Sequence, residues 1–292
     1  MSSQSYYAGQ YPPASNIAFP PASAPFAPLY PPAPLPMPVD KFERLRAIAA
    51  KYEINEEFVK KLHQLEGFEI VCLFDDSGSM NEPAAPGKVS AFSKTQSRWD
   101  EAKTSAGIIV DIASVFDPTG IDIYFLNRPA IRNITGGEQL INTPQFANLP
   151  SGSTPLAKKF REILTEKAEV ARERKLLIII ATDGAPTNDH NQYDIPGFKL
   201  ALESRNPMHR IFVTIMACTD DEEAVGYLNK WDKKMKNLDV VDDYFSEKKE
   251  IQKAKGSKYR FSHGDYIVKA LLGSIDKSFD RLDEKKKSCT IM

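Results

Sequence analysis

Cysteine is scarce in this 292-residue chain, which contains only Cys72, Cys218 and Cys289. An odd number of widely separated cysteines does not supply a disulfide framework or a cysteine-rich zinc centre. The sequence contains no run near the roughly 18 apolar residues of a membrane-spanning helix. Its first residues have neither the basic nor the apolar region of a signal peptide. These features together predict a protein of the reducing cytoplasm.

The chain also lacks an excess of charge of either sign. Its 38 Lys and Arg residues nearly cancel its 39 Asp and Glu residues. The overall charge therefore gives no reason to expect nucleic acid as a partner. A hydrophobic content of 42% in 292 residues is enough for one large domain with appendages, or for two small domains.

Residues 1–39 form a proline-rich tail that contains eleven of the 21 prolines and no charged residue. Proline fixes its own backbone and lacks an N–H donor, so this composition predicts a disordered, partly polyproline II segment. Such segments bind aromatic-lined grooves of the SH3 or WW type. A solvated tail without a specific partner is the alternative, and the sequence does not decide between the two.

A short helical extension is predicted at residues 40–66. Asp40 and Asn55 are candidate N-caps, and apolar residues recur at helical spacing between them. We expect two short helices whose apolar faces pack on the main domain.

From residue 67 to 276, apolar segments alternate with amphipathic ones. Strands are predicted at 68–74, 120–127, 131–134, 175–184, 209–218 and 238–244. Helices are predicted at 95–116, before Leu149, and at 154–175, 197–204, 221–234 and 264–275. Nearly continuous apolar strands separated by helices are typical of a mostly parallel sheet covered on both faces. The sequence therefore predicts a doubly wound, Rossmann-like α/β domain.

Polar side chains follow two of these predicted strands. The stretch FEIVCLFDDSGSM places Asp75, Ser77 and Ser79 directly after an apolar strand, and ATDG places Asp183 after another. Thr154 lies in the turn LPSGSTPL at the start of a predicted helix. In doubly wound folds, ligands bind beyond the carboxyl ends of the strands. We therefore expect these five residues at one edge of the sheet.

Carboxylate and hydroxyl oxygens without His or Cys favour a hard cation, and Mg²⁺ (or Mn²⁺) is the cofactor that we predict. The two carboxylates of Asp75 and Asp183 together only balance the double positive charge of the ion. Neutral hydroxyls leave the ion able to accept a further carboxylate from outside.

The pattern Asp75-x-Ser77-x-Ser79, followed by Thr154 and by Asp183 in a TDG turn, resembles the metal-ion-dependent adhesion site of von Willebrand factor type A domains. The likeness covers residues 68 to 275. It implies that Ser77, Ser79 and Thr154 contact the ion directly, while Asp75 and Asp183 hold it mainly through water. It also implies a protein partner that presents an Asp or Glu carboxylate. The long segment 80–94 departs from the family pattern. The partners of other family members are therefore a weaker guide to the partner of this chain.

The same residues allow other interpretations. An EF-hand starting at Asp75 needs Gly and Glu at its sixth and twelfth positions, where this chain has Met80 and Pro86. No GxGxxG or GxxxxGK[ST] motif supports nucleotide binding. A hydrolase that uses Ser77 or Ser79 with Asp183 and His190 remains an alternative, as does a purely structural turn capped by these side chains.

The tail 277–292 ends in Cys289-Thr-Ile-Met, which matches the C-a-a-X prenylation motif, and Met in the last place favours farnesyl. Lys285, Lys286 and Lys287 precede it, but nearby acids offset part of their charge. One lipid gives only marginal membrane residence. The sequence thus predicts a non-enzymatic, metal-dependent protein-binding module, reversibly tethered to a membrane through Cys289. A metal-assisted hydrolase and a scaffold that binds through its proline-rich tail are the alternatives.

Overall fold

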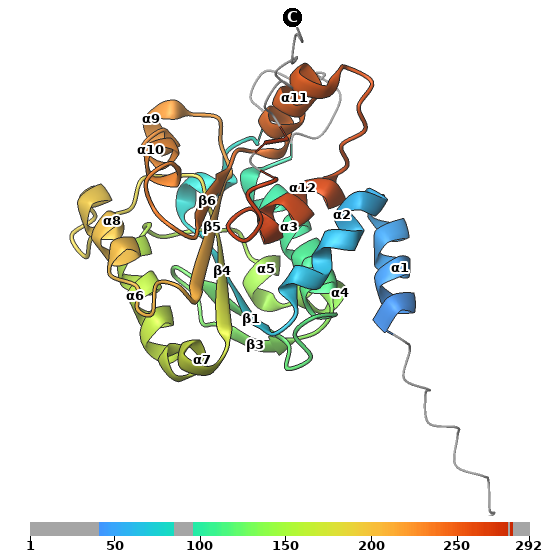
Figure 1. The fold of residues 1–292 in the computed structure, drawn as a ribbon. Coiled ribbons are helices and arrows are strands. Elements are labelled where there is room, and N and C mark those ends of the chain that lie inside the picture. The colour runs from blue at the N-terminus through green and yellow to red at the C-terminus, as the bar shows by residue number, and fades with distance from the viewer. Residues whose placement is uncertain (1–40, 85–95, 280, 283–292) are drawn as a thin grey trace, which may run out of the picture. The chain divides into compact units, whose positions relative to one another are not determined.

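Figure 1 shows the computed structural model of the chain, which describes residues 41–84, 96–279 and 281–282. The chain divides into Met1–Pro38 and Val39–Met292, and the described residues belong to the second unit. The predicted proline-rich tail, most of the 80–94 segment and Cys289 lie outside the described residues. None of the described helices has the length and apolar character needed to cross a bilayer.

A six-stranded sheet in the order β3-β2-β1-β4-β5-β6 forms the centre of the fold. Neighbouring strands are parallel except for the antiparallel pair β2 and β3. The strands are β1 (Phe68–Phe74), β2 (Ile121–Phe125), β3 (Ile131–Ile134), β4 (Lys175–Thr182), β5 (Ile211–Ala217) and β6 (Leu238–Val241). The predicted mixed α/β fold with a mostly parallel central sheet is confirmed.

Both faces of the sheet are buried, as its nearly continuous apolar strands require. Successive side chains of a strand point to opposite faces. In β1, Ile70, Cys72 and Phe74 belong to one hydrophobic cluster, whereas Val71 and Leu73 belong to the other. The core therefore consists of two apolar layers, one on each side of the sheet.

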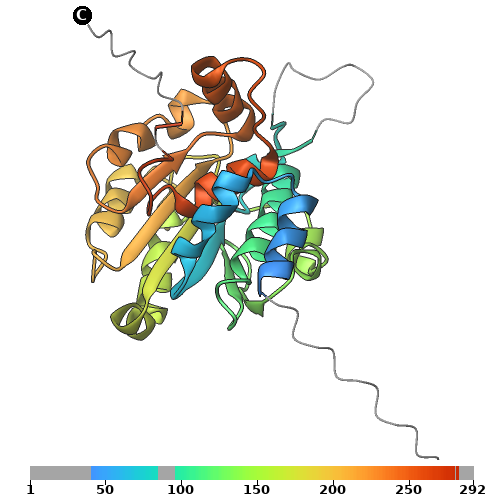
Figure 2. The same ribbon diagram turned by 45° about the vertical axis from the view of Figure 1, so that its right-hand side comes forward.

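Helices cover each of these layers (Figures 1 and 2). One layer is covered by α1 (Lys41–Lys51), α2 (Glu56–Lys61), η1 (Leu62–Leu65), α3 (Arg98–Ala113), α4 (Gly137–Ile141), α5 (Pro144–Ala147), α11 (Tyr244–Lys255) and α12 (His263–Leu272). The other is covered by α6 (Leu156–Glu166), α7 (Ala168–Glu173), α8 (Ile195–Glu203), α9 (Glu222–Val225) and α10 (Leu228–Asp232). A single 3-10 turn, η2 (Gly78–Asn81), follows β1.

Several predicted boundaries were wrong. The helix predicted at 154–175 is two helices, α6 and α7, which break at Lys167. The helix predicted at 221–234 is likewise divided into α9 and α10. The strand predicted at 238–244 ends at Val241, and the following helix α11 was not predicted. Asp243 caps α11 by accepting hydrogen bonds from the backbone N–H groups of Phe245 and Ser246, which ends the strand and begins the helix.

Candidate metal centre

The strand order reverses between β1 and β4, at the middle of the sheet. From β1 the chain continues outward to β2 and β3, whereas from β4 it continues to β5 and β6 on the other side. Loops that leave two such strands in opposite directions open a crevice at their carboxyl ends. Asp75 follows β1 and Asp183 follows β4, so both residues lie at this crevice.

Asp75 is completely buried, and both of its oxygens accept hydrogen bonds. Oδ1 accepts from the backbone N–H of Ser77 at 2.9 Å, and Oδ2 accepts from the Thr182 hydroxyl at 2.6 Å. Burial, followed by the charge of Asp183, raises the pKa of Asp75 to about 7, although these hydrogen bonds act in the opposite direction. A cation beside Asp75 would favour its charged form.

Three further oxygens form a chain in front of Asp75. The Ser77 and Ser79 hydroxyl oxygens are 3.1 Å apart, and the Ser79 hydroxyl donates to Asp183 Oδ1 at 2.9 Å. Adjacent ligands of an octahedral Mg²⁺, each about 2.1 Å from the ion, are separated by about 3.0 Å. The spacing of these oxygens therefore fits the edge of a magnesium coordination shell.

Thr154 lies on the loop that faces this oxygen chain. The loop is held against η2 by two hydrogen bonds: Gly78 N–H donates to Gly152 O at 3.2 Å, and Asn81 Nδ2 donates to Pro150 O at 2.9 Å. Thr154 itself is 7% exposed. Among the described residues, no hydrogen bond joins its hydroxyl to the other four predicted ligands. Four of the five residues are thus directly connected. The backbone of Thr154 is hydrogen-bonded to Thr187 instead, with its N–H donating to Thr187 Oγ1 at 3.1 Å.

Arg98 belongs to the site and was not anticipated from the sequence. It is the first residue of α3, and its guanidinium forms an ion pair with Asp183 Oδ2 at 2.8 Å. The Asp183 side chain is completely buried and that of Arg98 is 16% exposed. Ser97 caps the helix in a capping box with Asp100, which fixes the start of α3 beside Asp183. The sequence Ser97-x-x-Asp100 is the signal that could have placed Arg98 at a helix start, which the predicted helix 95–116 did not use.

Asp76 is also buried, but its side chain turns away from the oxygen chain. Its Oδ1 accepts hydrogen bonds from the backbone and side-chain nitrogens of Asn127, at 2.8 and 3.1 Å. Its Oδ2 pairs with Arg128 Nε at 3.1 Å. Its backbone oxygen accepts from Ser151 N–H at 2.8 Å. Asp76 therefore ties the loops after β1, β2 and α5 together, and it positions the turn that carries the serines.

His190, the base required by the hydrolase alternative, is exposed. Its backbone N–H donates to Asn188 Oδ1 at 2.9 Å, within the 188–192 turn. Within the described ranges, no hydrogen bond connects its imidazole to Ser77, Ser79 or Asp183. The structure thus gives the two serines hydroxyl and carboxylate neighbours and no histidine base.

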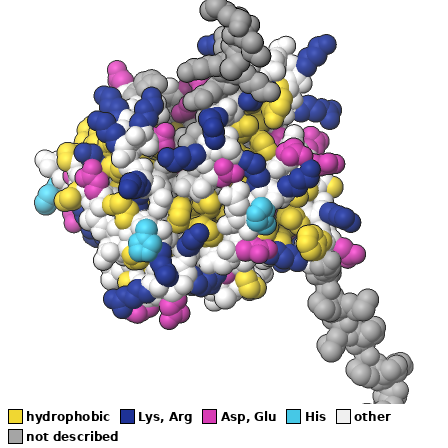
Figure 3. All heavy atoms as spheres, in the orientation of Figure 1, with side chains coloured by type: hydrophobic (Ala, Val, Ile, Leu, Met, Phe, Trp, Pro, Cys, Tyr) yellow, Lys and Arg dark blue, Asp and Glu magenta, His cyan; other side chains and the backbone are white. Residues whose placement is uncertain are grey.

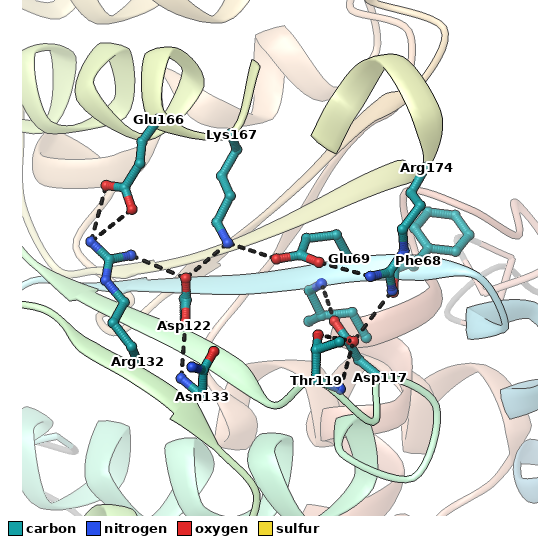
Figure 4. A network of polar contacts seen from close by, with 11 residues as sticks. Phe68, Glu69, Asp117, Thr119, Asp122, Arg132, Asn133, Glu166, Lys167 and Arg174 are labelled. Carbon is teal, nitrogen blue, oxygen red and sulfur yellow. Dashed lines mark hydrogen bonds and ion pairs between the residues drawn. The ribbon is translucent and has the colours of Figure 1, made fainter. Parts of the chain in front are cut away.

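A second charged cluster lies at the amino ends of β1 and β2 (Figure 4). Lys167 Nζ lies 2.6 Å from Glu69 Oε1 and 2.8 Å from Asp122 Oδ2. Arg132 pairs with Asp122, and Arg174 pairs with Glu69. Every charge in this network has an opposite charge in contact, so we assign it to stability and not to ligand binding.

No group of three or more His, Cys, Asp and Glu side chains in the described part of the chain is arranged to hold a metal ion. A metal at the crevice would therefore depend on the serine and threonine oxygens. Comparison with known proteins found no matching family model and no matching curated protein.

Proposed function

We propose that Asp75, Ser77, Ser79, Thr154 and Asp183 bind Mg²⁺ or Mn²⁺, and that the chain is a non-enzymatic protein-binding module of the von Willebrand factor type A kind. The chain of oxygens from Ser77 through Ser79 to Asp183 carries this proposal, because its spacing suits a hard cation. The buried Asp75 behind it supplies the second negative charge.

The partner that suits such a site presents an Asp or Glu carboxylate. When bound, the ion supplies positive charge at the crevice. Asp75 accepts a backbone hydrogen bond that shapes the Ser77 turn, and Asp76 anchors the same turn to neighbouring loops. Both residues thus keep the hydroxyl oxygens aligned before a partner arrives.

Titration calorimetry with Mg²⁺ and Mn²⁺ tests the metal site. Ser79 is exposed, so Ser79→Ala removes one oxygen with little effect on folding. We expect this variant to bind metal at least tenfold more weakly, and Asp75→Ala to lose binding. Asp189→Ala, which removes an exposed carboxylate elsewhere, is the matched control. Equal affinity in Ser79→Ala and Asp189→Ala would contradict the assignment.

A partner retained by the immobilised protein in Mg²⁺ should be released by EDTA and should not bind Ser79→Ala. Replacing the partner's interacting Asp or Glu by Asn or Gln should have the same effect. Retention in excess EDTA would instead support the scaffold alternative, in which the tail 1–39 binds SH3 or WW domains.

We further propose that Cys289 carries a farnesyl group, which makes the protein cytoplasmic and peripheral to a membrane. The motif CTIM supports this proposal. Intact mass spectrometry of the protein from eukaryotic cells should show the lipid in place of Thr290 to Met292. Cys289→Ser should move the protein to the soluble fraction, and an unmodified Cys289 would contradict the anchor.

A further inference from the structure

A cavity of about 790 Å³ lies beside β6, the strand at one edge of the sheet. The turn before β6, the end of α11 and the segment after α12 surround it. Apolar side chains, among them Met235, Leu238 and Ile275, form part of its lining. Four lysines also line it, and together they define what we call the lysine pocket: Lys233, Lys236, Lys253 and Lys277.

The lysine pocket concentrates positive charge on a chain whose net charge is −1. All four lysines are exposed, and none forms an ion pair with another residue that the structure describes. The acidic residues that line the cavity are Asp232 and Glu250. Lys230 and Lys234 lie close in sequence to Lys233 and Lys236, and Lys249 and Lys255 lie close to Lys253. Figure 3 shows Lys and Arg side chains over the region that α9 and α10 occupy in Figure 1.

We propose that the lysine pocket binds the anionic phospholipid headgroups of a membrane surface. Clusters of four to eight lysines and arginines attract acidic lipids and supply the second signal that a single lipid anchor needs. Lysines also attract other anionic partners, and we choose a membrane because the proposed farnesyl group would hold the chain at one. Cys289 is seven residues beyond Leu282, a reach of at most about 25 Å of extended chain. Lys277, which lines the pocket, is five residues before Leu282.

The position of the lysine pocket leaves the metal centre free to bind a partner. Phe212, near the amino end of β5, lines the pocket, whereas Ala217 at the carboxyl end pairs with Thr182, next to Asp183. Parallel strands rise about 3.3 Å per residue, so about 17 Å of strand separates these two levels. A membrane at the pocket therefore approaches the amino ends of the strands, and the metal centre lies at the opposite ends.

Sedimentation with vesicles tests this proposal on the full-length protein from bacteria, which do not prenylate Cys289. Vesicles of phosphatidylcholine alone are compared with vesicles containing about one third phosphatidylserine, in EDTA and at low salt. We expect at least tenfold tighter binding to the acidic vesicles. Each lysine near an anionic surface strengthens binding about fivefold. The double variant Lys236→Gln/Lys253→Gln should therefore bind about 25-fold more weakly.

Lys158→Gln/Lys199→Gln is the matched control, because it removes two exposed lysines from α6 and α8 and leaves the same net charge. It should change binding less than twofold. An equal loss in the two double variants, or equal binding to both kinds of vesicle, would overturn the proposal. Tighter binding to polyuridylic acid than to acidic vesicles would overturn it in favour of nucleic acid. Because EDTA and an unmodified Cys289 are used, none of these outcomes depends on the metal centre or the farnesyl group.

Discussion

Arg98 places a positive charge at the candidate metal centre, where the sequence predicted only oxygens. Its ion pair with Asp183 Oδ2 neutralises one of the two carboxylates. A divalent cation beside Asp183 must overcome the repulsion of this guanidinium. In the proposed metal site, Arg98 therefore lowers the affinity for the ion while its ion pair orients Asp183.

Replacing Arg98 by Gln should raise the Mg²⁺ affinity. A divalent ion about 6 Å from a unit positive charge is repelled by about 1.4 kcal/mol even at the dielectric constant of water, which corresponds to about tenfold in affinity. Titration calorimetry of Arg98→Gln measures this change, with Arg161→Gln, at an exposed position of α6, as the control. A weaker metal affinity in Arg98→Gln would show that Arg98 mainly positions Asp183.

Two half-buried ionisable residues give the stability of the fold an unusual dependence on pH. Burial lowers the pKa of His263 from 6.5 to about 4, and its Nε2 lies 3.0 Å from the Ser105 hydroxyl. Burial, followed by the charge of Asp243, raises the pKa of Glu101 from 4.5 to about 7. The folded state thus favours neutral forms of both residues. His263 costs stability as the pH falls from 6.5 to 4, whereas Glu101 costs stability as the pH rises from 4.5 to 7.

Glu101→Gln should separate these opposing effects. At pH 8 the variant should be more stable than the wild type by an amount on the order of 2 to 3 kcal/mol, because it removes a half-buried charge. Between pH 6.5 and 4.5 it should lose stability more steeply on acidification, since the His263 effect is no longer offset. Urea denaturation at a series of pH values measures both results. Glu250→Gln, at an exposed site, should follow the wild type, and a variant less stable than the wild type at pH 8 would refute the assignment.

At the scale of single elements, Lys167 explains why one predicted helix is two. The break between α6 and α7 occurs at this residue, whose backbone has φ −92° and ψ 10°. Its side chain is 10% exposed and reaches both Glu69 and Asp122 (Figure 4). The amphipathic pattern of 154–175 contains no signal for this contact, because its partners lie on strands about 45 and 98 residues away.

Lys167→Met should destabilise the protein by about 3 to 5 kcal/mol, because it leaves two buried carboxylates without their shared cation. Lys158→Met, in the same helix region but with its side chain 60% exposed, should change stability by less than about 0.5 kcal/mol. Chemical denaturation of the two variants makes the comparison. A loss below about 1 kcal/mol for Lys167→Met would mean that Arg132 and Arg174 suffice to compensate the carboxylates.

At the scale of the whole molecule, the sequence predicts the sheet better than its helical cover. The apolar runs of β1 and β4 determine the buried centre, and the polar residues that follow them are brought together by the parallel topology. Arg98 and Lys167 could not be placed in this way, because their roles depend on contacts between segments far apart in sequence. The lysine pocket likewise arises from three separate segments, each of which alone resembles an ordinary solvated surface.

The helical extension is packed into the same core as the sheet. Phe58, Leu62 and Leu65 are buried in the layer that also contains α3 and α12. Asn55 N–H donates to Asp265 Oδ1 at 2.7 Å. Gly264, at the start of α12, approaches so closely that an added Cβ would lie 2.3 Å from the Tyr52 carbonyl oxygen. The extension therefore completes the core and fixes the start of α12.

Removing residues 1–66 should therefore unfold the protein, whereas removing residues 1–39 should not. Burial of a large apolar side chain contributes about 1.5 to 3 kcal/mol. The extension buries five of them, namely Ile48, Ile54, Phe58, Leu62 and Leu65. Their loss is comparable to the roughly 5 to 15 kcal/mol that stabilise a whole domain. Thermal and urea denaturation of the two truncated proteins, beside the full chain, measures the difference. If the protein without residues 1–66 still unfolds cooperatively at the full-length midpoint, the extension is a separate appendage. If the protein without residues 1–39 loses its cooperative transition, the proline-rich segment contributes to the fold.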